Sequence, residues 1–535
     1  MQMEIKSSER YLERYSRHAV LLLVLLAFAL RIYHLGFQSL WYDEIATVVS
    51  SVRLSLSEMM NLILEGNQHH MPLYFLFMRL WSGLGSGEFV LRYFSLIWAI
   101  LSIPLIYAVG RLIGGISVGI LAAFLLAISP YHIWYSQEAR MYAITPTLIL
   151  AAHWFLFRAI RHKRWKDWGG YLVCMLVAVY MHYFILFVFA AHYFFFAFHY
   201  RRIKPLFYRW IIAAGVAGLL FGIWVAVILL RGGYQSGPIW ISFANWYEPF
   251  LTITAFSVGP TIDPGYWLYY VVPIIYLFAV GVCFFYWARS REGGGEVNDS
   301  SEYWASRLLM FWLFVPILIT YLISIDWSIP SQKSFYIDRY IIYVLPALLL
   351  AAAWGLITLA ARIDRAWFLP AVVGIIVLIT AASLKNLYTE PLYSRSNWRP
   401  VLNQLAAEVE AEDAILGYPV DLLPIFYYVG EGTDFRELPD PSSRSRNPDG
   451  AGGGFEDVVN EISGTADRIW LITHFFNNNP HGFPQRRNER LEDAALNSGP
   501  KVWLDGHYKM LGEWIVTGVN LSLYDLSAPL DLEAG

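Results

Sequence analysis

The sequence predicts an α-helical polytopic membrane protein of about eleven transmembrane helices, followed by a C-terminal soluble α/β domain. Of 535 residues, 57% are hydrophobic and only 15% are charged, whereas a soluble domain averages about 25% charged residues. Long apolar runs occupy residues 18–384, and beyond Lys385 the apolar runs shorten to strand length while Pro, Gly, Asp and Asn become more frequent. These two compositions indicate two parts of different character.

The transmembrane helices are predicted from the length of the apolar runs. A helix that crosses a hydrocarbon core of about 30 Å needs roughly 20 apolar residues. The fifth and sixth predicted crossings form one apolar stretch that is interrupted at Met181-His182-Tyr183, so they could be two short helices or one bent element. The predicted crossings are residues 18–37, 89–110, 115–132, 140–158, 168–181, 183–199, 210–230, 266–287, 306–325, 339–361 and 367–384.

Basic residues predict the orientation of these helices, because cytoplasmic loops carry an excess of Lys and Arg. With a cytoplasmic N-terminus, the loops predicted to lie inside hold most of the basic residues, among them Arg158, Arg161, Lys163, Arg164, Lys166, Arg201, Arg202, Lys204 and Arg209. An odd number of crossings places the C-terminus outside. We therefore expect a transmembrane domain over 1–384 with an outer juxtamembrane loop at 38–88, and an extracytoplasmic domain over 385–535, in a bacterial plasma membrane.

The C-terminal domain is expected to be a small α/β fold. Residues 414–418 and 468–473 have the pattern of buried strands, 398–410 and 487–496 that of helices, and 512–524 that of a closing strand pair. This part has no nucleotide-binding glycine motif and no metal-ligand spacing, so we expect no independent chemistry there. A net charge of -3 without a block of Lys or Arg indicates no nucleic-acid partner.

An acidic pair, Asp43 and Glu44, follows the first predicted span and the residues Leu40-Trp41-Tyr42. Aromatic residues are favoured at a membrane–water interface, and carboxylates at that depth are costly to desolvate. A carboxylate held there is a candidate general base that faces one side of the bilayer. The alternative is a solvated pair that only ends a helix.

Cations mark two further segments on the predicted outer side. Arg140 opens the fourth span, and Lys333 and Arg339 precede or open the tenth. A guanidinium at this depth needs an anionic partner, and its planar fork suits phosphate. Glu138 or Glu44 could instead pair with Arg140 in a structural ion pair.

Three histidines fall on the same predicted face. His182 marks the break between the fifth and sixth spans, while His69 and His70 lie in the first outer segment. Neighbouring residues of a regular backbone point in different directions, so at most one of His69 and His70 faces a site. An ordinary structural role is the alternative for His182, and a solvent-exposed loop is the alternative for the pair.

Several of these segments resemble one family of membrane enzymes. They are the acidic pair, the His-containing loop that leads to Pro72-Leu73-Tyr74, and Tyr135-Ser136-Gln137-Glu138-Ala139-Arg140-Met141-Tyr142-Ala143. Asp338-Arg339-Tyr340 followed by Leu345-Pro346-Ala347-Leu348 opens a late span in a similar way. Together they resemble the GT-C membrane glycosyltransferases, in particular the family 39 group of protein mannosyltransferase and aminoarabinose transferase relatives. The resemblance covers residues 18–384.

The resemblance implies a mannose-like hexose donor on a polyprenyl phosphate, anchored among membrane lipids and presented outside. It assigns Asp43 as the base that takes the hydroxyl proton of the acceptor, with inversion at the anomeric carbon. Arg140 and Arg339, with Lys333 behind them, would bind the donor phosphate. Glu44 would orient the surroundings of Asp43, bind sugar hydroxyls or assist a metal together with His70.

The same resemblance implies further substrate contacts and partners. The acceptor is expected to be a glycan, a lipid or a protein. No cofactor is required on this interpretation, although a divalent metal is compatible with it. The residues expected to contact substrate are His70, Gln137, Glu138, Tyr142 and His182.

Two other functions fit parts of the same pattern. A transporter or flippase of a lipid-linked or anionic solute would also carry ionisable residues in the membrane, but such proteins tend to have internal repeats and charges at the bilayer midplane. Here no clear repeat is visible, and most ionisable residues lie near the ends of the predicted spans. An oligosaccharide-transferring ligase would share the architecture and differ in the length of its substrate.

Overall fold

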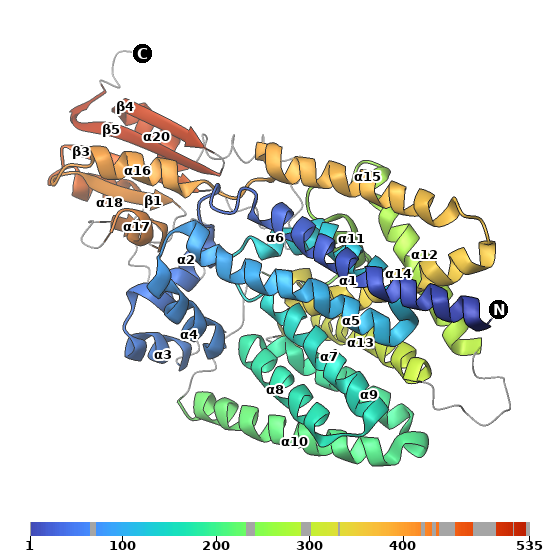
Figure 1. Cartoon of the computed structure of the whole chain (residues 1–535). Helices are drawn as coiled ribbons and strands as arrows, with labels where there is room; N and C mark the ends of the chain where they lie inside the picture. The colour runs from blue at the N-terminus through green and yellow to red at the C-terminus, as the bar shows by residue number, and fades with distance from the viewer. Residues whose placement is uncertain are drawn as a thin grey trace. The chain divides into compact units, whose positions relative to one another are not determined.

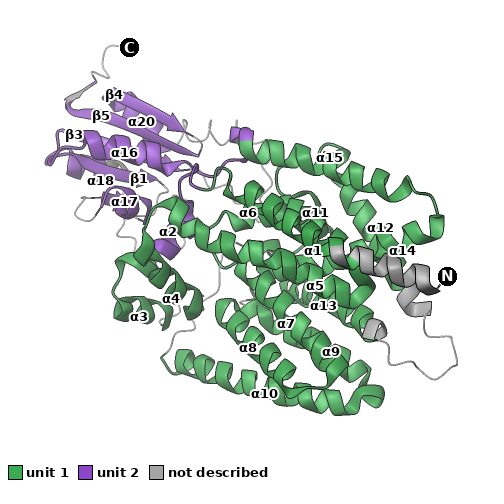
Figure 2. Ribbon diagram, in the orientation of Figure 1, with its two compact units in different colours: residues 1–35, 50–388 green, residues 36–49, 389–535 purple. Residues whose placement is uncertain are grey.

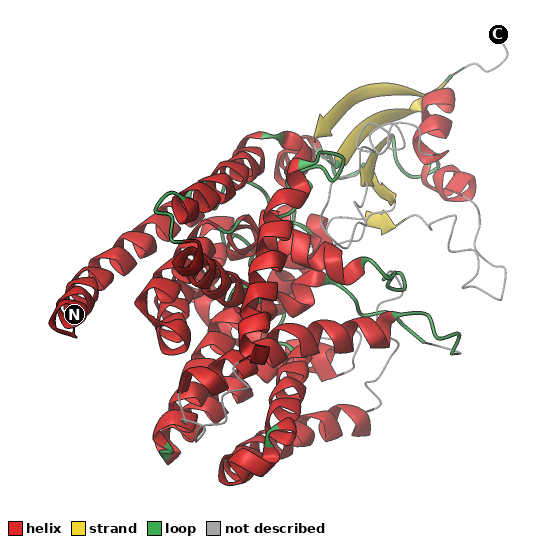
Figure 3. Ribbon diagram, turned by 90° about the vertical axis from the view of Figure 1, so that its right-hand side faces the viewer, coloured by secondary structure: helices red, strands yellow, loops and turns green. Residues whose placement is uncertain are grey.

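The computed structural model describes residues 2–64, 71–231, 241–289, 301–329, 332–418, 423–430, 435–437, 455–474, 499–516 and 518–530. The chain divides into two compact units (Figure 2). The first unit comprises residues 1–35 and 50–388, and the second comprises residues 36–49 and 389–535. Helices build the first unit, and the described strands belong to the second (Figure 3).

The first unit is an assembly of helices (Figure 1). Seven of the described helices are long and apolar enough to cross a membrane, which confirms the predicted polytopic helical fold. The helices are α1 (Gln2–Ile32), α3 (Leu56–Leu64), α4 (Pro72–Trp81), α5 (Glu88–Ile128), α6 (Pro130–Ser136), α7 (Ile144–His162), α8 (Trp165–Met181), α9 (Leu186–Phe198), α10 (Tyr200–Leu230), α11 (Glu248–Val258), α12 (Leu268–Arg289), α13 (Ser301–Ser324), α14 (Leu345–Ile363) and α15 (Phe368–Thr389).

The predicted number of about eleven crossings exceeds these seven helices, and the difference lies in shorter elements. Each of the predicted segments is helical over most of its length. The segments at 115–132, 140–158, 168–181 and 183–199 belong to helices that are shorter, less apolar or continuous with a neighbour. That these four segments cross the membrane stays a prediction.

The chain reverses direction within α5, at Gly114 and Gly115. Gly115 has a φ of 87°, a backbone conformation that favours glycine. A Cβ on Gly110 would lie 2.7 Å from the Cα of Gly119, and a Cβ on Gly119 would lie 2.6 Å from the carbonyl oxygen of Tyr107. In a straight helix Gly110 and Gly119 would be about 14 Å apart. The two arms of α5 therefore form a tight helical hairpin, and they correspond to the second and third predicted spans.

The apolar stretch around His182 forms two helices, which is one of the two alternatives that the sequence left open. α8 ends at Met181, and His182 has an extended backbone with φ -155° and ψ 120°. The short 3-10 turn η3 (Tyr183–Ile185) then leads into α9. The imidazole of His182 accepts the backbone N–H of Phe184 at 3.3 Å, so this side chain caps the turn at the break.

A buried guanidinium fixes the end of α1. Arg31 is fully buried and donates to the carbonyl oxygens of Leu126 and Ala127 at 2.9 and 2.8 Å. A helix leaves its last carbonyl groups without helical partners, and Arg31 satisfies two of them at the C-terminus of α5. The Nη2 atom of Arg31 also lies 2.9 Å from Nδ1 of His132, in α6. The start of the 129–142 segment is thereby attached to α1.

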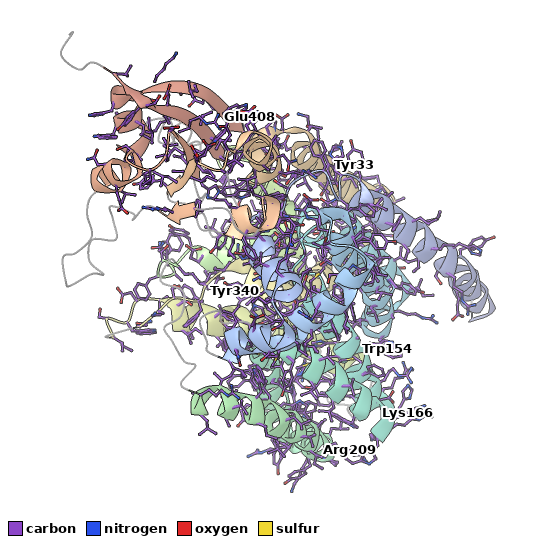
Figure 4. The ribbon with its side chains drawn as sticks, turned by 90° about the vertical axis from the view of Figure 1, so that its left-hand side faces the viewer. Tyr33, Trp154, Lys166, Arg209, Tyr340 and Glu408 are labelled. Atoms are coloured by element: carbon purple, nitrogen blue, oxygen red, sulfur yellow. The ribbon has the colours of Figure 1, made fainter. Side chains whose placement is uncertain are left out.

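Basic side chains gather at one end of the first unit. Lys166 and Arg209 lie toward the same end, away from Tyr340 (Figure 4). Arg209 donates from Nη1 to the carbonyl oxygen of Lys163 at 2.6 Å, which connects α10 to the loop between α7 and α8. Three of the basic residues that predicted the cytoplasmic side, Lys163, Lys166 and Arg209, therefore lie at the same end of this unit.

The second unit contains a five-stranded sheet in the order β2-β1-β3-β5-β4. β1 pairs in parallel with β2 and β3, while β5 runs antiparallel to β3 and β4. The predicted strands and the closing strand pair are confirmed. The strands are β1 (Ala414–Tyr418), β2 (Phe435–Glu437), β3 (Arg468–His474), β4 (Tyr508–Val516) and β5 (Val519–Pro529).

Helices pack around this sheet and complete its core. α16 (Trp398–Glu408) confirms the helix predicted over 398–410, whereas the helix predicted over 487–496 lies outside the described residues. Leu416, Ile469 and Leu471 are fully buried in one apolar cluster, because alternate residues of each strand face the helices. The remaining described helices of the C-terminal part are α17 (Leu423–Tyr428), α18 (Phe455–Ile462) and α20 (Gly499–His507).

The second unit also includes α2 (Tyr42–Val48), which lies between α1 and α3 in the sequence. α2 has 7 residues and carries the acidic pair in its first turn. The sequence assigned this segment to the outer loop of the transmembrane domain. In the structure, residues 36–49 are grouped with the C-terminal residues.

We predict that Gly355→Ala lowers the thermal stability of the protein. A Cβ on Gly355 would overlap the carbonyl oxygen of Ala279 and lie 2.5 Å from its carbonyl carbon, so α14 and α12 approach backbone to backbone, as small residues allow in membrane proteins. Overpacking of this kind costs about 1–3 kcal/mol. Thermal unfolding in detergent measures the effect. In the matched variant Gly374→Ala the added Cβ meets nothing within 4 Å, and a Tm equal to that of Gly355→Ala would contradict the close approach.

Candidate functional site

Asp43 and Glu44 have different surroundings in the first turn of α2. Glu44 is fully buried and Asp43 is half-buried. The Glu44 carboxylate accepts the backbone N–H of Trp41 at 3.2 Å and lies 3.6 Å from Nη1 of Arg395. The backbone carbonyl oxygen of Asp43 accepts a hydrogen bond from the Thr47 hydroxyl at 2.9 Å within the helix. Successive helical residues point about 100° apart, so Glu44 anchors α2 while the Asp43 carboxylate points elsewhere.

His474, at the end of β3, supports the chain segment that carries Arg395. Its Nε2 lies 2.9 Å from Oγ of Ser396, and its ring packs against Trp398 with centroids 4.5 Å apart. Burial lowers the pKa of His474 to about 3, because a charged imidazole is poorly solvated there. The imidazole is therefore neutral in the folded protein at neutral pH.

Arg140 lies in the segment between α6 and α7 and is almost fully buried. Its backbone carbonyl oxygen accepts Oγ of Ser95 at 3.1 Å, which holds the segment against α5. Its guanidinium carbon lies 5.8 Å from the centroid of the Tyr142 ring, and the Tyr142 ring meets the Tyr135 ring edge-on at 5.2 Å. The Arg140 guanidinium therefore lies over the ring of Tyr142, whose face attracts a cation, and Tyr135 packs against the same ring.

Arg339 enters the same neighbourhood from the 3-10 segment η4 (Asp338–Val344), which precedes α14. The Asp338 carboxylate is buried and accepts the backbone N–H of Arg339 at 2.7 Å. The Arg339 guanidinium carbon lies 5.7 Å from the centroid of the Tyr340 ring. The Tyr340 ring lies 5.3 Å from that of His182, and His182 in turn interacts electrostatically with Arg140.

Ring contacts and electrostatic interactions connect these residues in one group, which we call the arginine cluster. Tyr135 links its two sides, because the charges of Asp338, Glu138 and Arg339 all act on this side chain. The structure thus brings together five of the residues that the sequence proposed for substrate binding. The cluster consists of Tyr135, Glu138, Arg140, Tyr142, His182, Asp338, Arg339 and Tyr340.

Hydrogen bonds from buried aromatic residues fix the backbone on which the cluster is built. The hydroxyl of Tyr343 donates to the carbonyl oxygen of Phe184 at 2.8 Å, which joins η4 to η3. The indole N–H of Trp312 donates to the carbonyl oxygen of Tyr343 at 3.0 Å. The segments that carry His182 and Arg339 are therefore held at a fixed separation.

The remaining predicted site residues are placed differently. Nε2 of Gln137 donates to the carbonyl oxygens of Arg31 and Tyr33 at 2.9 and 2.8 Å, so its amide hydrogens hold the end of α1. Lys333 is half-buried in the segment before η4. His70 lies outside the described residues. Among the residues that the structure describes, no group of three or more His, Cys, Asp or Glu side chains is placed to hold a metal ion.

Sequence reasoning missed several residues of this arrangement. Asp338 and Tyr340 flank Arg339, so the charged and aromatic run around a predicted phosphate ligand was a usable signal. Arg395 gave no such signal, because it lies in the C-terminal region of mixed composition, far from Glu44 in the sequence. Tyr343 and Trp312 look like ordinary apolar span residues, and only their hydrogen bonds distinguish them.

The chain was compared with known protein families, curated proteins and solved structures. Residues 69–227 match the family described as Dolichyl-phosphate-mannose-protein mannosyltransferase. No curated protein matches the chain significantly. ArnT from Cupriavidus metallidurans in the apo state is similar in structure, with a TM-score of 0.58 and 11% identity over 94% of this chain and 97% of that chain.

Two further structures support the same fold. ArnT from Cupriavidus metallidurans bound to undecaprenyl phosphate gives a TM-score of 0.56 and 12% identity, again over 94% of this chain and 97% of that chain. The Archaeoglobus fulgidus oligosaccharyltransferase tethered with an acceptor peptide gives 0.52 and 10%, over 96% of this chain and 74% of that chain. The chain therefore shares the fold of these membrane proteins, and its residues 69–227 match the mannosyltransferase family in sequence.

The likeness to ArnT confirms the predicted fold, and the family match supports the predicted resemblance over residues 69–227. The family match contains the Arg140 segment and His182. The likeness in fold to the GT-C protein ArnT covers 94% of this chain, so it includes the C-terminal domain, which the sequence resemblance over 18–384 did not reach. The predicted localisation as an integral membrane protein is confirmed by the long apolar helices and by the likeness in fold to ArnT.

We predict that the stability of the wild-type protein falls below pH 6.5 relative to that of His474→Asn. The pKa of His474 is lowered to about 3 by folding, from about 6.5 in the unfolded chain. Between these pH values the unfolded chain binds more protons, so the contribution of His474 is complete above pH 6.5 and is lost toward pH 3, by on the order of 3–5 kcal/mol. Thermal unfolding from pH 4 to pH 8 measures the difference in Tm, and a difference that does not vary with pH would contradict the buried neutral imidazole.

Proposed function

We propose that this GT-C protein transfers a mannose-like hexose from a polyprenyl phosphate-linked donor to an acceptor hydroxyl at the outer face of the bacterial plasma membrane. The observation that carries the proposal is the arginine cluster, in which Arg140 and Arg339 come from distant segments. Arg140 lies over the Tyr142 ring and Arg339 over the Tyr340 ring, and His182 packs against Tyr340 and is acted on by the charge of Arg140. The two guanidinium groups suit a sugar-linked phosphate as ligand, because guanidinium groups bind phosphate oxygens in a bidentate manner. The GT-C protein ArnT, with the same fold, has been solved with undecaprenyl phosphate.

Asp43 is the proposed general base. Its carboxylate takes the proton of the acceptor hydroxyl as that oxygen forms a bond to the anomeric carbon, and the bond from this carbon to the phosphate oxygen breaks on the opposite side. The products are an inverted glycoside and free polyprenyl phosphate. The half-buried position of Asp43 in the first turn of α2 supports this role. The neighbouring Glu44 is fully buried beside Arg395, so we assign it to orienting α2.

Arg140 and Arg339 are proposed to stabilise the departing phosphate. Negative charge grows on the phosphate as the glycosidic bond breaks, and fixed cations act strongly on it in a buried setting. Glu138, Tyr142 and His182 belong to the same cluster and are proposed to contact the sugar or the phosphate. Lys333 remains a candidate for attracting the donor, and Gln137 is assigned to holding α1.

The proposed reaction uses no cofactor. Each of its steps is assigned to a side chain of this chain, and a divalent metal enters only as a possible aid to Glu44 and His70. The acceptor is a glycan, a lipid or a protein. The likeness in fold to an oligosaccharyltransferase tethered with an acceptor peptide places protein among the acceptors to be tried first.

We predict that Asp43→Asn lowers transfer by about 10²–10⁴-fold, because a positioned base contributes an acceleration of that size. Protein in liposomes is supplied with polyprenyl-phosphate mannose and acceptor extracts, and release of polyprenyl phosphate is followed over time. Glu412→Gln, which neutralises an exposed carboxylate of the C-terminal domain, is the matched control. Wild-type turnover by Asp43→Asn would rule out the base assignment. No release by the wild-type protein with several sugars would favour the transporter alternative.

We predict that Arg140→Ala weakens binding of polyprenyl phosphate by about 10–100-fold, since a hydrogen bond to a charged group contributes roughly 1.5–3 kcal/mol. Arg140→Lys keeps the charge without the planar fork, so an intermediate affinity is expected. Titration of the protein with the lipid in detergent measures Kd. Arg201→Ala removes an exposed guanidinium at the start of α10 and serves as control. A Kd for Arg140→Ala equal to that of the control would assign Arg140 a structural role only.

A further inference from the structure

The segment that carries the proposed base is held by the C-terminal domain through contacts at residues 37–41 and 44. Residues 36–49 and 389–535 form one compact unit. The contacts come from one short stretch after α15, residues 395–399, and from Tyr428 at the end of α17. These two elements contact the residues that connect α1 to α2.

Arg395 contacts three positions of this segment. Its backbone N–H donates to Oε1 of Gln38 at 3.4 Å, its guanidinium carbon lies 5.8 Å from the centroid of the Trp41 ring, and its Nη1 lies 3.6 Å from the Glu44 carboxylate. The Arg395 side chain is 9% exposed and that of Glu44 is 0% exposed. In such surroundings an ion pair is weakly screened, so the pairing determines which side of α2 faces Arg395.

Side-chain hydrogen bonds hold the chain just before α2. Oγ of Ser39 donates to the carbonyl oxygen of Ser396 at 3.2 Å and to Oδ1 of Asn397 at 3.0 Å. Ser39 and Ser396 are 357 residues apart in the sequence. Ser39 is fully buried, so these bonds do not compete with water.

The backbone on both sides of Ser39 is fixed as well. The N–H of Leu40 donates to the hydroxyl oxygen of Tyr428 at 2.9 Å. Nη2 of Arg399 donates to the carbonyl oxygen of Phe37 at 2.6 Å. The start of α2 is thereby fixed in place, while the pair of Glu44 with Arg395 fixes the rotation of α2 about its own axis.

We infer that Arg395 is a positioning residue for the general base, and that the C-terminal domain acts in catalysis by orienting α2. The inference rests on the proposed function of Asp43. Glu44 points toward Arg395, and the Asp43 carboxylate lies about 100° from it round the helix, so the pair of Glu44 with Arg395 sets the direction of the Asp43 carboxylate. Loss of the anchor lets α2 rotate or shift, and a displacement of about 1 Å in a reacting group can cost about 10²-fold in rate.

The test separates this role from a general structural one. Arg395→Ala is expected to lower kcat at least tenfold while KM for the donor stays within twofold, because the donor phosphate is assigned to other residues. Arg395→Lys keeps the charge and is expected to restore part of the loss. Arg436→Ala removes an exposed guanidinium of the same domain, paired with exposed Glu461, and should leave kcat unchanged.

A second measurement does not depend on transferase activity. In protein whose Cys174 and Cys283 are replaced by Ala, a cysteine placed by Asp43→Cys is labelled with a membrane-impermeant thiol reagent. Adding Arg395→Ala, or Tyr428→Phe should Arg395→Ala fail to fold, is expected to change the labelling rate at least threefold. An absence of transfer by the wild-type protein would reject the proposed function, and the labelling rate would still decide the orientation of α2.

Three results would overturn the inference. The first is a wild-type kcat for Arg395→Ala, and the second is a loss carried by KM instead of kcat. The third is a labelling rate at position 43 that neither Arg395→Ala nor Tyr428→Phe changes. Thermal unfolding of each variant confirms that the compared proteins are folded.

Discussion

Polar groups within the helical unit must find their partners in the protein, because a lipid bilayer supplies none. This constraint explains why Arg31 is aimed at the last carbonyl groups of α5. It also explains why the Trp312 indole N–H and the Tyr343 hydroxyl donate hydrogen bonds to backbone carbonyl oxygens. These bonds fix the ends of several helices and the segments between them relative to one another. The arginine cluster depends on them, since it is assembled from the segments that those ends carry.

The residues assigned to the reaction stand where regular helix gives way to other backbone. His182 lies between α8 and α9, Arg140 lies between α6 and α7, and Arg339 lies in a 3-10 segment. Irregular backbone exposes N–H and C=O groups, so in a membrane protein it is tolerated where protein or water surrounds it. Charged side chains are tolerated in the same places. The chemistry and the breaks in the helices therefore share a physical cause.

The sequence predicted the helical segments well, because apolar length is a property of each segment by itself. It also found Arg140, His182 and Arg339, since charged or polar residues beside long apolar runs stand out. It could not predict that Arg395 reaches Glu44 or that Ser396 reaches Ser39, because no local pattern links residues so far apart, 357 positions in the case of the two serines. The α5 hairpin shows the same contrast: its apolar arms were visible, whereas the contact of Gly110 with Gly119 depends on packing.

The grouping of residues 36–49 with the C-terminal domain has a consequence for biosynthesis. The ribosome produces α2 early, but Arg395, Ser396 and Tyr428 emerge only after the helices of the first unit have been made. Contacts between segments so far apart in the sequence form late in folding. The contacts that hold the acidic pair therefore form only after residues 395–428 have been synthesised. A chain truncated before residue 395 would keep its membrane helices and lose the contacts that hold α2.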